Sequence, residues 1–328
     1  MKRIATVIAG FVALGGGVIL AASSPDRAEA QDCSVTVTDV DFGEPDLLSG
    51  DPVDAMASVH ARCNNVPLQR LVKMCLPLQG GAGGAGGGLR YMMGPNGRTL
   101  AYQLYRDSSR TVPWGPSDGG EGSVPGILLG TGVLVSPEAY VTIYARVFPN
   151  QAQTPAGLYL SEFSGAEVAF GWRSILVLGA DTDCSGFIPT HTVHPAFEVR
   201  ALLRPSCEIT ATDLAFGRIG LLYDPVFAQS KLTVNCSAGA AFAVSLDDGQ
   251  SGAGPGERRM TSAGGDAVAY NLYHDEARTR PWGSAPSTDH EGIGAGSAQT
   301  LLVYGLVPAQ STPPPGAYRD RVTAILTY

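Results

Sequence analysis

Polar and apolar residues alternate along several short stretches of the chain. Val35 and Val37 alternate with Thr36 and Thr38, and similar alternation recurs at residues 140–148, 231–236 and 321–328. A period of two is typical of a β-strand with one buried face. No amphipathic helical pattern of useful length occurs after residue 30. The pattern therefore predicts an all-β protein.

Clusters of glycine and proline separate these stretches. They lie at residues 80–88, 115–122, 249–257 and 311–316. Such residues favour turns, and many short strands between turn signals are typical of antiparallel β-sandwiches. We therefore expect immunoglobulin-like sandwiches.

One stretch occurs twice in the chain. YQLYRDSSRTVPWG (102–115) and YNLYHDEARTRPWG (270–283) share nine of fourteen positions at an offset of 168. Residues 33–45 match 207–219 at an offset of 174, and 155–159 match 314–318 at 159. A repeat this long predicts two homologous domains rather than a solenoid. We place them at 31–203 and 204–328.

The residues shared by the two copies should serve what the copies have in common, which is the fold. We therefore assign a structural role to Tyr102, Tyr105, Asp107 and Trp114 and to their partners in the second copy. Residues that carry a specific function are better sought where the copies differ.

The N-terminus has the pattern of an export signal. Lys2 and Arg3 precede an apolar run, and Ala28 and Ala30 supply the small residues of a cleavage site. We expect a signal peptide at 1–30, with cleavage after Ala22 as an alternative site. An uncleaved membrane anchor is the other interpretation, because the run could just span a bilayer.

Charge argues against nucleic-acid binding. Removal of residues 1–30 would leave 19 Lys and Arg against 28 Asp and Glu, with no basic patch. Such a surface repels a phosphate backbone.

Six cysteines remain after residue 30, an even number that suggests disulfides in an exported protein. Cys33 and Cys63 match Cys207 and Cys236, so each pair should close within its own copy. Each bridge would be worth about 3–4 kcal/mol in the loop-entropy account. Cys75 and Cys184 have no counterparts and are left to pair with each other. A metal site is the weaker alternative, because no CxxC spacing occurs.

Catalytic signals are weak. No G-x-S-x-G motif occurs, no pair of carboxylates is marked, and His191 and His194 alone do not define a zinc site. We expect no enzyme, no cofactor and no metal. A secreted carbohydrate-active enzyme remains the weakest alternative.

The repeated motifs resemble a known family. Two cysteines about thirty residues apart around Phe-Gly, then R-x-M, Y-x-L-Y-x-D…WG and a closing P-x-G-x-Y are similar to the spore coat U domain, over 33–163 and 207–328. That family includes subunits of archaic, Csu-type chaperone–usher pili. The resemblance implies a sandwich that lacks one strand. A periplasmic chaperone fills the gap first, and the N-terminal extension of the next subunit replaces it after passage through an outer-membrane usher.

The two copies differ in the length of chain after the closing motif. After Tyr159 there are 47 residues before Cys207, and they include an alternating set formed by Phe197, Val199, Ala201 and Leu203. After Tyr318 there are ten. We expect the first sandwich to supply its own last strand and the second to need a donor strand. The other interpretation makes 164–206 a linker.

The start of the chain indicates the position of the subunit in the fibre. Only Gln31 and Asp32 would precede Cys33 after cleavage, so we expect a subunit that accepts a strand and donates none. Such a subunit occupies the fibre end. The resemblance thus implies a two-domain tip adhesin at the cell surface that mediates attachment and biofilm formation. A structural spore-coat or pilus-shaft protein without an outside ligand is the alternative.

Adhesion should reside where the first copy has additional residues. Between the shared Trp and Tyr (114–144 against 282–304) the first copy is eight residues longer. An apolar run there, formed by Val124, Pro125, Ile127, Leu128 and Leu129, is our candidate for contact with a hydrophobic or host surface. A buried strand is the competing interpretation. The glycine-rich loop 80–88 is a second candidate, unless it is a flexible spacer.

Overall fold

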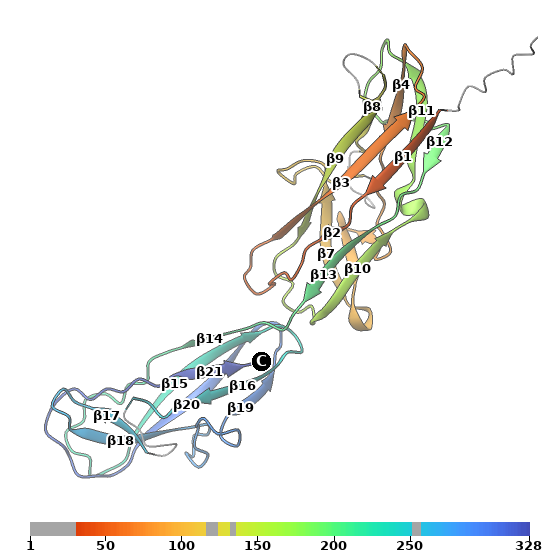
Figure 1. The fold of residues 1–328 in the computed structure, drawn as a ribbon. Coiled ribbons are helices and arrows are strands. Elements are labelled where there is room, and N and C mark those ends of the chain that lie inside the picture. The colour runs from red at the N-terminus through yellow and green to blue at the C-terminus, as the bar shows by residue number, and fades with distance from the viewer. Residues whose placement is uncertain (1–30, 116–123, 132–135, 251–256) are drawn as a thin grey trace, which may run out of the picture.

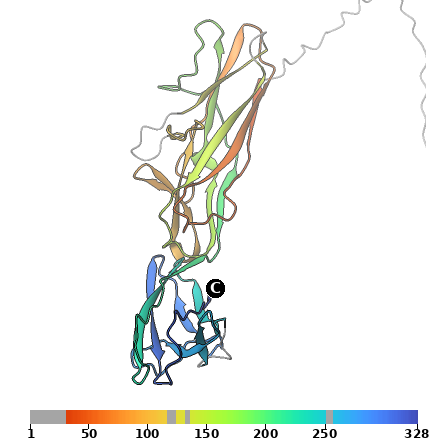
Figure 2. The ribbon, with the colours of Figure 1, turned by 90° about the vertical axis from the view of Figure 1, so that its left-hand side faces the viewer.

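A computed structural model describes residues 31–115, 124–131, 136–250 and 257–328 (Figure 1). These residues form β-strands and two short 3-10 turns, η1 (Pro95–Gly97) and η2 (Gly165–Val168), with no α-helix among them. No helix within the described ranges is long and apolar enough to span a membrane. The structure confirms the all-β prediction, and the two sandwiches lie end to end (Figures 1 and 2).

The described residues of the first sandwich form thirteen strands. They are β1 (Asp32–Val37), β2 (Val40–Asp41), β3 (Val53–Asn64), β4 (Arg70–Cys75), β5 (Ala85–Gly86), β6 (Leu89–Met93), β7 (Thr99–Tyr105), β8 (Gly126–Leu129), β9 (Glu138–Val147), β10 (Gly157–Phe163), β11 (Phe170–Leu176), β12 (His191–Val193) and β13 (Phe197–Leu203). One sheet has the order β1-β3-β9-β7-β6-β10-β13-β2, with β5 paired to β6, and the other has the order β12-β11-β4-β8.

The second sandwich repeats this plan with fewer strands. They are β14 (Cys207–Ala211), β15 (Val226–Cys236), β16 (Ala241–Leu246), β17 (Arg258–Thr261), β18 (Ala267–Tyr273), β19 (His290–Ile293), β20 (Ala298–Val307) and β21 (Ala324–Thr327). The sheet orders are β14-β15-β20-β18-β17 and β19-β16-β21. The strand β21 pairs with β16 as β11 pairs with β4. No strand of the described residues takes the place that β13 has in the first sandwich.

Each sandwich has its own hydrophobic core, one formed by residues of 33–203 and the other by residues of 207–326. The repeated tryptophans lie at the centre of both. The Trp114 indole Nε1 donates to the Leu76 carbonyl at 2.7 Å, and the Trp282 Nε1 donates to the Val244 carbonyl at 2.9 Å. Their roles are therefore structural, because the same bond ties the motif to the facing sheet in both copies.

In both copies, the arginine of the R-x-M motif donates a hydrogen bond to the backbone carbonyl of the repeated tryptophan. Arg258 is fully buried, and its guanidinium donates to the carbonyls of Trp282 and Asp247 and to the Asn271 side chain at 2.7–2.8 Å. Arg90 makes equivalent bonds to the Trp114 and Leu78 carbonyls and to Gln103. Burial lowers the pKa of Arg90 to about 10, so the group remains charged at neutral pH and its bonds to carbonyl oxygens compensate its desolvation.

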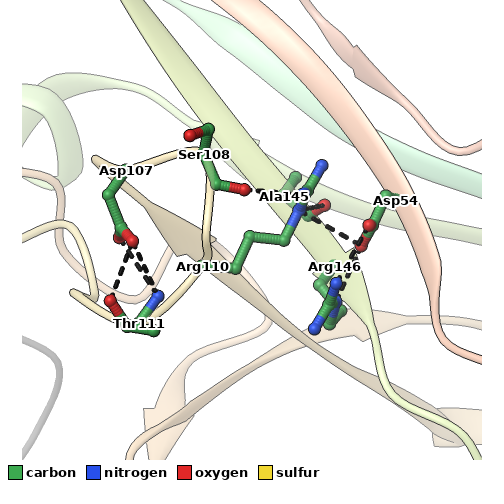
Figure 3. Close-up of polar contacts among 7 residues, drawn as sticks. All are labelled: Asp54, Asp107, Ser108, Arg110, Thr111, Ala145 and Arg146. Carbon is green, nitrogen blue, oxygen red and sulfur yellow. Dashed lines mark hydrogen bonds and ion pairs between the residues drawn. The ribbon is translucent and has the colours of Figure 1, made fainter.

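The polar part of the repeated motif closes a tight loop (Figure 3). The Asp107 carboxylate accepts bonds from the Thr111 backbone N–H and from the Thr111 hydroxyl, at 3.0 and 2.8 Å. Arg110 adopts a positive φ of 56° and its side chain lies 3.2 Å from Asp54. Asp275 and Thr279 make the same bonds in the second copy. This part of the motif also belongs to the fold.

The structure contains three disulfides. Cys33 is bonded to Cys63 and Cys207 to Cys236, each across neighbouring strands of its own sandwich. Cys75 is bonded to Cys184, which fastens the loop before β12 to β4. These are the pairs expected from the repeat, and no free cysteine occurs in the described chain.

The glycine-rich stretch 80–88 packs against the first sandwich at Gly81 and Gly83. A side chain at Gly83 would collide with the Tyr91 carbonyl, and one at Gly81 would collide with Ser161 and Phe163. The glycines let this backbone pack directly against β6 and β10.

Candidate strand-binding groove and apolar apex

The strand β13 completes the first sandwich. It runs antiparallel to β10, in a register that places Phe197 opposite Phe163 and Leu203 opposite Gly157. Its other edge runs parallel to β2. The inward residues Phe197, Val199, Ala201 and Leu203 are all buried, and Phe197 stacks on Phe163 with 4.6 Å between ring centroids. As expected from the sequence, the first sandwich thus supplies its own last strand.

Backbone bonds fix β13 against the β2 side of the sandwich. The Phe42 N–H donates to the Arg200 carbonyl at 2.9 Å, and the Leu202 N–H donates to the Gly43 carbonyl at 2.8 Å. The Asp39 carboxylate accepts the Glu198 N–H at 2.8 Å. A strand in this position therefore satisfies two sheet edges at once.

The corresponding place in the second sandwich is a groove. Two adjoining hollows of about 750 and 810 Å³ share Leu214, Phe216, Met260 and Tyr318 as lining residues. One wall is the segment 211–222 and the other is the segment 312–324. Leu232, Leu246, Leu272 and Val303, which belong to the core, form part of the floor. The groove therefore opens directly onto the hydrophobic core.

Both walls present backbone groups without partners among the described residues. Leu214, Phe216 and Gly217 match Val40, Phe42 and Gly43, yet no ladder bond joins them to a neighbouring strand. On the other wall, residues 316–322 match β10 and pair with the rest of the sheet only at Arg319, which bonds to Thr261. The second sandwich therefore carries the same binding edges that β13 satisfies in the first.

One polar pair lies in the groove. The Tyr270 hydroxyl donates to the Asp320 carboxylate at 2.7 Å, where the first sandwich has Tyr102 and Ser161. Burial, and after it this bond to a carboxylate, raises the pKa of Tyr270 above its usual value. Asp320 also accepts the Gln250 N–H at 2.8 Å, so its charge is already compensated before any strand enters.

The structure places the central residues of the predicted adhesive loop in a strand. Ile127, Leu128 and Leu129 belong to β8, which pairs with β4, and Leu129 is fully buried in the core. Ile127 packs against the same core, and Val124 and Pro125 are half-buried just before the strand. The buried-strand interpretation is the one that the structure supports. Gly126 pairs with Cys75 as Glu291 pairs with Ala243, so the additional residues of the first copy lie on both sides of β8. The two connections that carry them contain 116–123 and 132–135, which lie outside the described residues.

Exposed apolar side chains gather instead at one end of the first sandwich. Leu68, in the turn between β3 and β4, is 81% exposed, and Leu178, just after β11, is 95% exposed. Leu176 and Val177 beside it are also exposed. The Val177 N–H donates to the Gln69 carbonyl at 3.2 Å, so the two turns are neighbours. We call Leu68, Leu176, Val177 and Leu178 the apolar apex.

A third turn joins the apolar apex. The Thr131 hydroxyl donates to the Val66 carbonyl at 3.2 Å, which places the β8–β9 connection beside the β3–β4 turn. Large apolar side chains at turn positions gain nothing for the core, and several together make the apolar apex a candidate contact surface. The sequence signal was present in Leu68, which comes directly after Pro67 in a turn, and in the run 175–178, which breaks the strand alternation.

Comparison with known proteins identifies the family. The sequence matches the Spore Coat Protein U domain over residues 20–164 and 194–325. It is 30% identical over 122 residues to Protein U of Myxococcus xanthus, an alignment that covers 32% of this chain and 68% of that protein. The chain belongs to the Spore Coat Protein U domain family.

Two solved structures are similar to the chain. The crystal structure of the chaperone–tip subunit complex CsuC–CsuE, from the archaic chaperone–usher Csu pili of Acinetobacter baumannii, aligns with a TM-score of 0.53 at 18% identity, covering 90% of this chain and 100% of that one. The CupB6 tip adhesin of Pseudomonas aeruginosa aligns with a TM-score of 0.40 at 11% identity, covering 90% and 94%. The first of these alignments shows a shared fold.

Proposed function

We propose that this protein is the tip subunit of a chaperone–usher pilus. Its second sandwich accepts a donor strand from the next subunit, and its first sandwich makes contact with a surface outside the cell. The role is adhesive and structural rather than catalytic. Attachment of cells to surfaces and to one another in a biofilm is the expected biological result.

The observation that carries the proposal is the contrast between the two sandwiches. One groove holds β13, whereas the homologous groove in the same chain is open to solvent along its core. An open apolar edge of this kind is an aggregation hazard unless a partner strand covers it. Strand addition supplies main-chain bonds for both walls and apolar side chains for the floor.

A chain with one filled and one open groove has one site for a neighbour. We therefore treat 31–203 and 204–328 as separately folding domains, with the second facing the fibre. The apolar apex lies at the end of the first sandwich remote from β13's exit into the second (Figure 1). That arrangement favours the apex as the surface-contacting end.

The implied route is export to the periplasm, capture by a periplasmic pilus chaperone and passage through an outer-membrane usher to the cell surface. The chaperone would fill the groove before assembly, and the next subunit would fill it afterwards. The likeness to a chaperone-bound tip subunit supports this order of events.

Donor-strand acceptance can be tested by fusion. A short flexible linker and a copy of residues 195–205, in which the two outward arginines are made neutral (Arg200→Gln and Arg204→Gln), are attached after Tyr328 of the full chain, and thermal unfolding is monitored. The fused strand should raise the melting temperature of the second sandwich by more than about 10 °C, since burial of four apolar side chains is worth several kcal/mol. The control fusion carries serine at the four inward positions. Equal melting of the two fusions would exclude the groove as a strand-binding site.

The adhesive role is tested separately. Cells that assemble the chain with Leu68 and Leu178 replaced by serine should make normal fimbriae and attach poorly to hydrophobic surfaces. Normal attachment by such cells would favour the alternative of a structural coat or shaft protein.

A further inference from the structure

The charges around the two homologous grooves are arranged differently. In the first sandwich the β2 side carries Asp41 and Glu44, and the strand that occupies the groove carries Arg200 and Arg204. Arg200 lies 2.9 Å from Asp41, and Arg204 lies 2.6 Å from Glu44. The acidic residues Asp41 and Glu44, which we call the acidic rim, thus form ion pairs with basic residues of the strand that fills the groove.

The second groove has lost that acidic rim. Ala215 stands where Asp41 stands in the first copy, and Arg218 stands where Glu44 stands. Both matches rest on the shared Phe-Gly, whose glycines both have a positive φ (65° at Gly43, 85° at Gly217). One acidic residue, Asp213, remains on this wall, and its counterpart Asp39 accepts a backbone N–H rather than a cation.

The opposite wall has become basic. Arg319 and Arg321 stand where β10 has Leu160 and Glu162. The match is structural as well, because Arg319 pairs with Thr261 as Leu160 pairs with Met93. In the first sandwich, Leu160 and Glu162 face Arg200 and Glu198 of β13. Residues of an incoming strand at these two outward positions would therefore lie beside Arg319 and Arg321.

These arginines have no compensating charge of their own. Arg218, Arg319 and Arg321 are exposed, and none makes an ion pair within the described parts of the chain. Of the two carboxylates that line the groove, Asp320 is engaged by Tyr270 and by backbone N–H groups, and Asp213 stands where Asp39 accepts a backbone N–H of β13 in the first sandwich. The open groove therefore presents an apolar floor between two walls that carry unpaired positive charge.

We propose that the second groove selects an acidic donor strand, namely the N-terminal segment of the neighbouring subunit with apolar residues facing inward and Asp or Glu facing Arg319, Arg321 and Arg218. This inference rests on the proposed function and adds the charge that the partner must carry. Opposite charges on paired strands attract, and like charges directly opposite repel. The same rule disfavours β13 itself in the second groove, because Arg200 would face Arg319 and Arg204 would face Arg218. The charge reversal thus keeps the two grooves from exchanging strands.

Two synthetic peptides test the selection on the full chain. Both copy residues 195–205 and keep the four inward apolar residues. The acidic peptide carries Arg200→Glu and Arg204→Glu, and the basic peptide carries Glu198→Lys. At low salt the acidic peptide should bind about tenfold more tightly in titration calorimetry, with a difference that shrinks as salt screens the charges.

A charge-reversed protein provides the complementary arm. The variant Arg319→Glu/Arg321→Glu should prefer the basic peptide, whereas Arg259→Glu/Arg280→Glu, an equal charge change at exposed residues that do not line the groove, should keep the preference for the acidic one. Equal affinity of both peptides for the unmodified chain would overturn the charge selection and leave strand acceptance standing. Failure of both peptides, together with no effect of the fused strand, would overturn the proposed function itself.

A third arm identifies the partner. In fimbriae from cells that express the chain, a photo-crosslinking residue in place of Arg321 should capture the first residues of the neighbouring subunit. Capture of the chaperone alone would assign the acidic strand to the chaperone and contradict the proposal.

Discussion

The substitution Phe197→Ala tests whether β13 is an integral strand of the first sandwich. Phe197 is 4% exposed, and its ring stacks on Phe163 at an interplanar angle of 10°. Replacement of a buried phenylalanine by alanine costs about 3–5 kcal/mol, and this cost includes the cavity that remains. Loss of the aromatic pair is worth about 0.5–1.5 kcal/mol within that range. The variant should therefore lose a large share of the stability of a single domain.

Two further variants refine this test. Val199→Ala removes two methyl groups from a fully buried position and should cost about 2 kcal/mol. Arg200→Ala, at an exposed position on the same strand, should leave the unfolding transition close to that of the unmodified chain. A loss of stability that decreases from Phe197→Ala through Val199→Ala to Arg200→Ala would indicate loss of packing. Similar losses for all three variants would indicate a general disturbance of the strand.

The assay is chemical denaturation of the full chain, monitored by tryptophan fluorescence. Trp114 and Trp172 report on the first sandwich and Trp282 on the second, so we expect two separable transitions. Only the transition of the first sandwich should shift. A shift of less than about 1 kcal/mol for Phe197→Ala would mean that residues 164–206 act as a linker in solution and would refute the reasoning.

Three other predictions concern the apex, the core and the third disulfide. Serine at Leu68 and Leu178 should leave the melting temperature unchanged, because both side chains are exposed, while binding to an octyl-agarose surface falls; unchanged binding would remove the apolar apex from the contact surface. Arg258→Met should destabilise the second sandwich by about 3 kcal/mol or more in denaturant titrations, because three buried acceptors lose a charged donor, and a near-neutral effect would show that water replaces it. Serine at both Cys75 and Cys184 should lower the stability of the first sandwich and leave the second unaffected in calorimetry; a change in the second would indicate coupling between them.

Much of the fold could be predicted from the sequence because the repeat provides an internal comparison. The alternation at Phe197, Val199, Ala201 and Leu203 predicted a strand, and the absence of a counterpart in the second copy predicted the groove. The cysteine pairs were likewise predicted from the repeat. Where both copies share a residue, as at Cys33 and Cys207, agreement between them excludes most alternatives; where only one copy has it, as at Phe197, Cys75 and Cys184, the difference itself is the signal.

The proposed contact surface, the apolar apex, could not be predicted in the same way. A short apolar run flanked by glycines, such as Ile127–Leu129, has the same pattern whether it forms a buried strand or an exposed loop. The neighbouring strand decides between them, and β4 lies far away in the sequence. Leu68 and Leu178 are 110 positions apart and meet only because two turns share one end of the sandwich. The charge reversal around the grooves also required the strand register before Arg319 could be matched with Leu160.

Amide hydrogen exchange along the two walls of the second groove tests the central claim most directly. In the full chain alone, the amides of 214–217 and of 317–322 other than Arg319 should exchange rapidly, whereas those of 40–43 and 158–163 should be protected by β13. Fusion of the donor segment after Tyr328 should slow exchange at both walls of the second groove, including the Phe216 N–H that matches the bonded Phe42 N–H. Walls that are already protected without a donor, or that exchange at the same rate with one, would contradict the account.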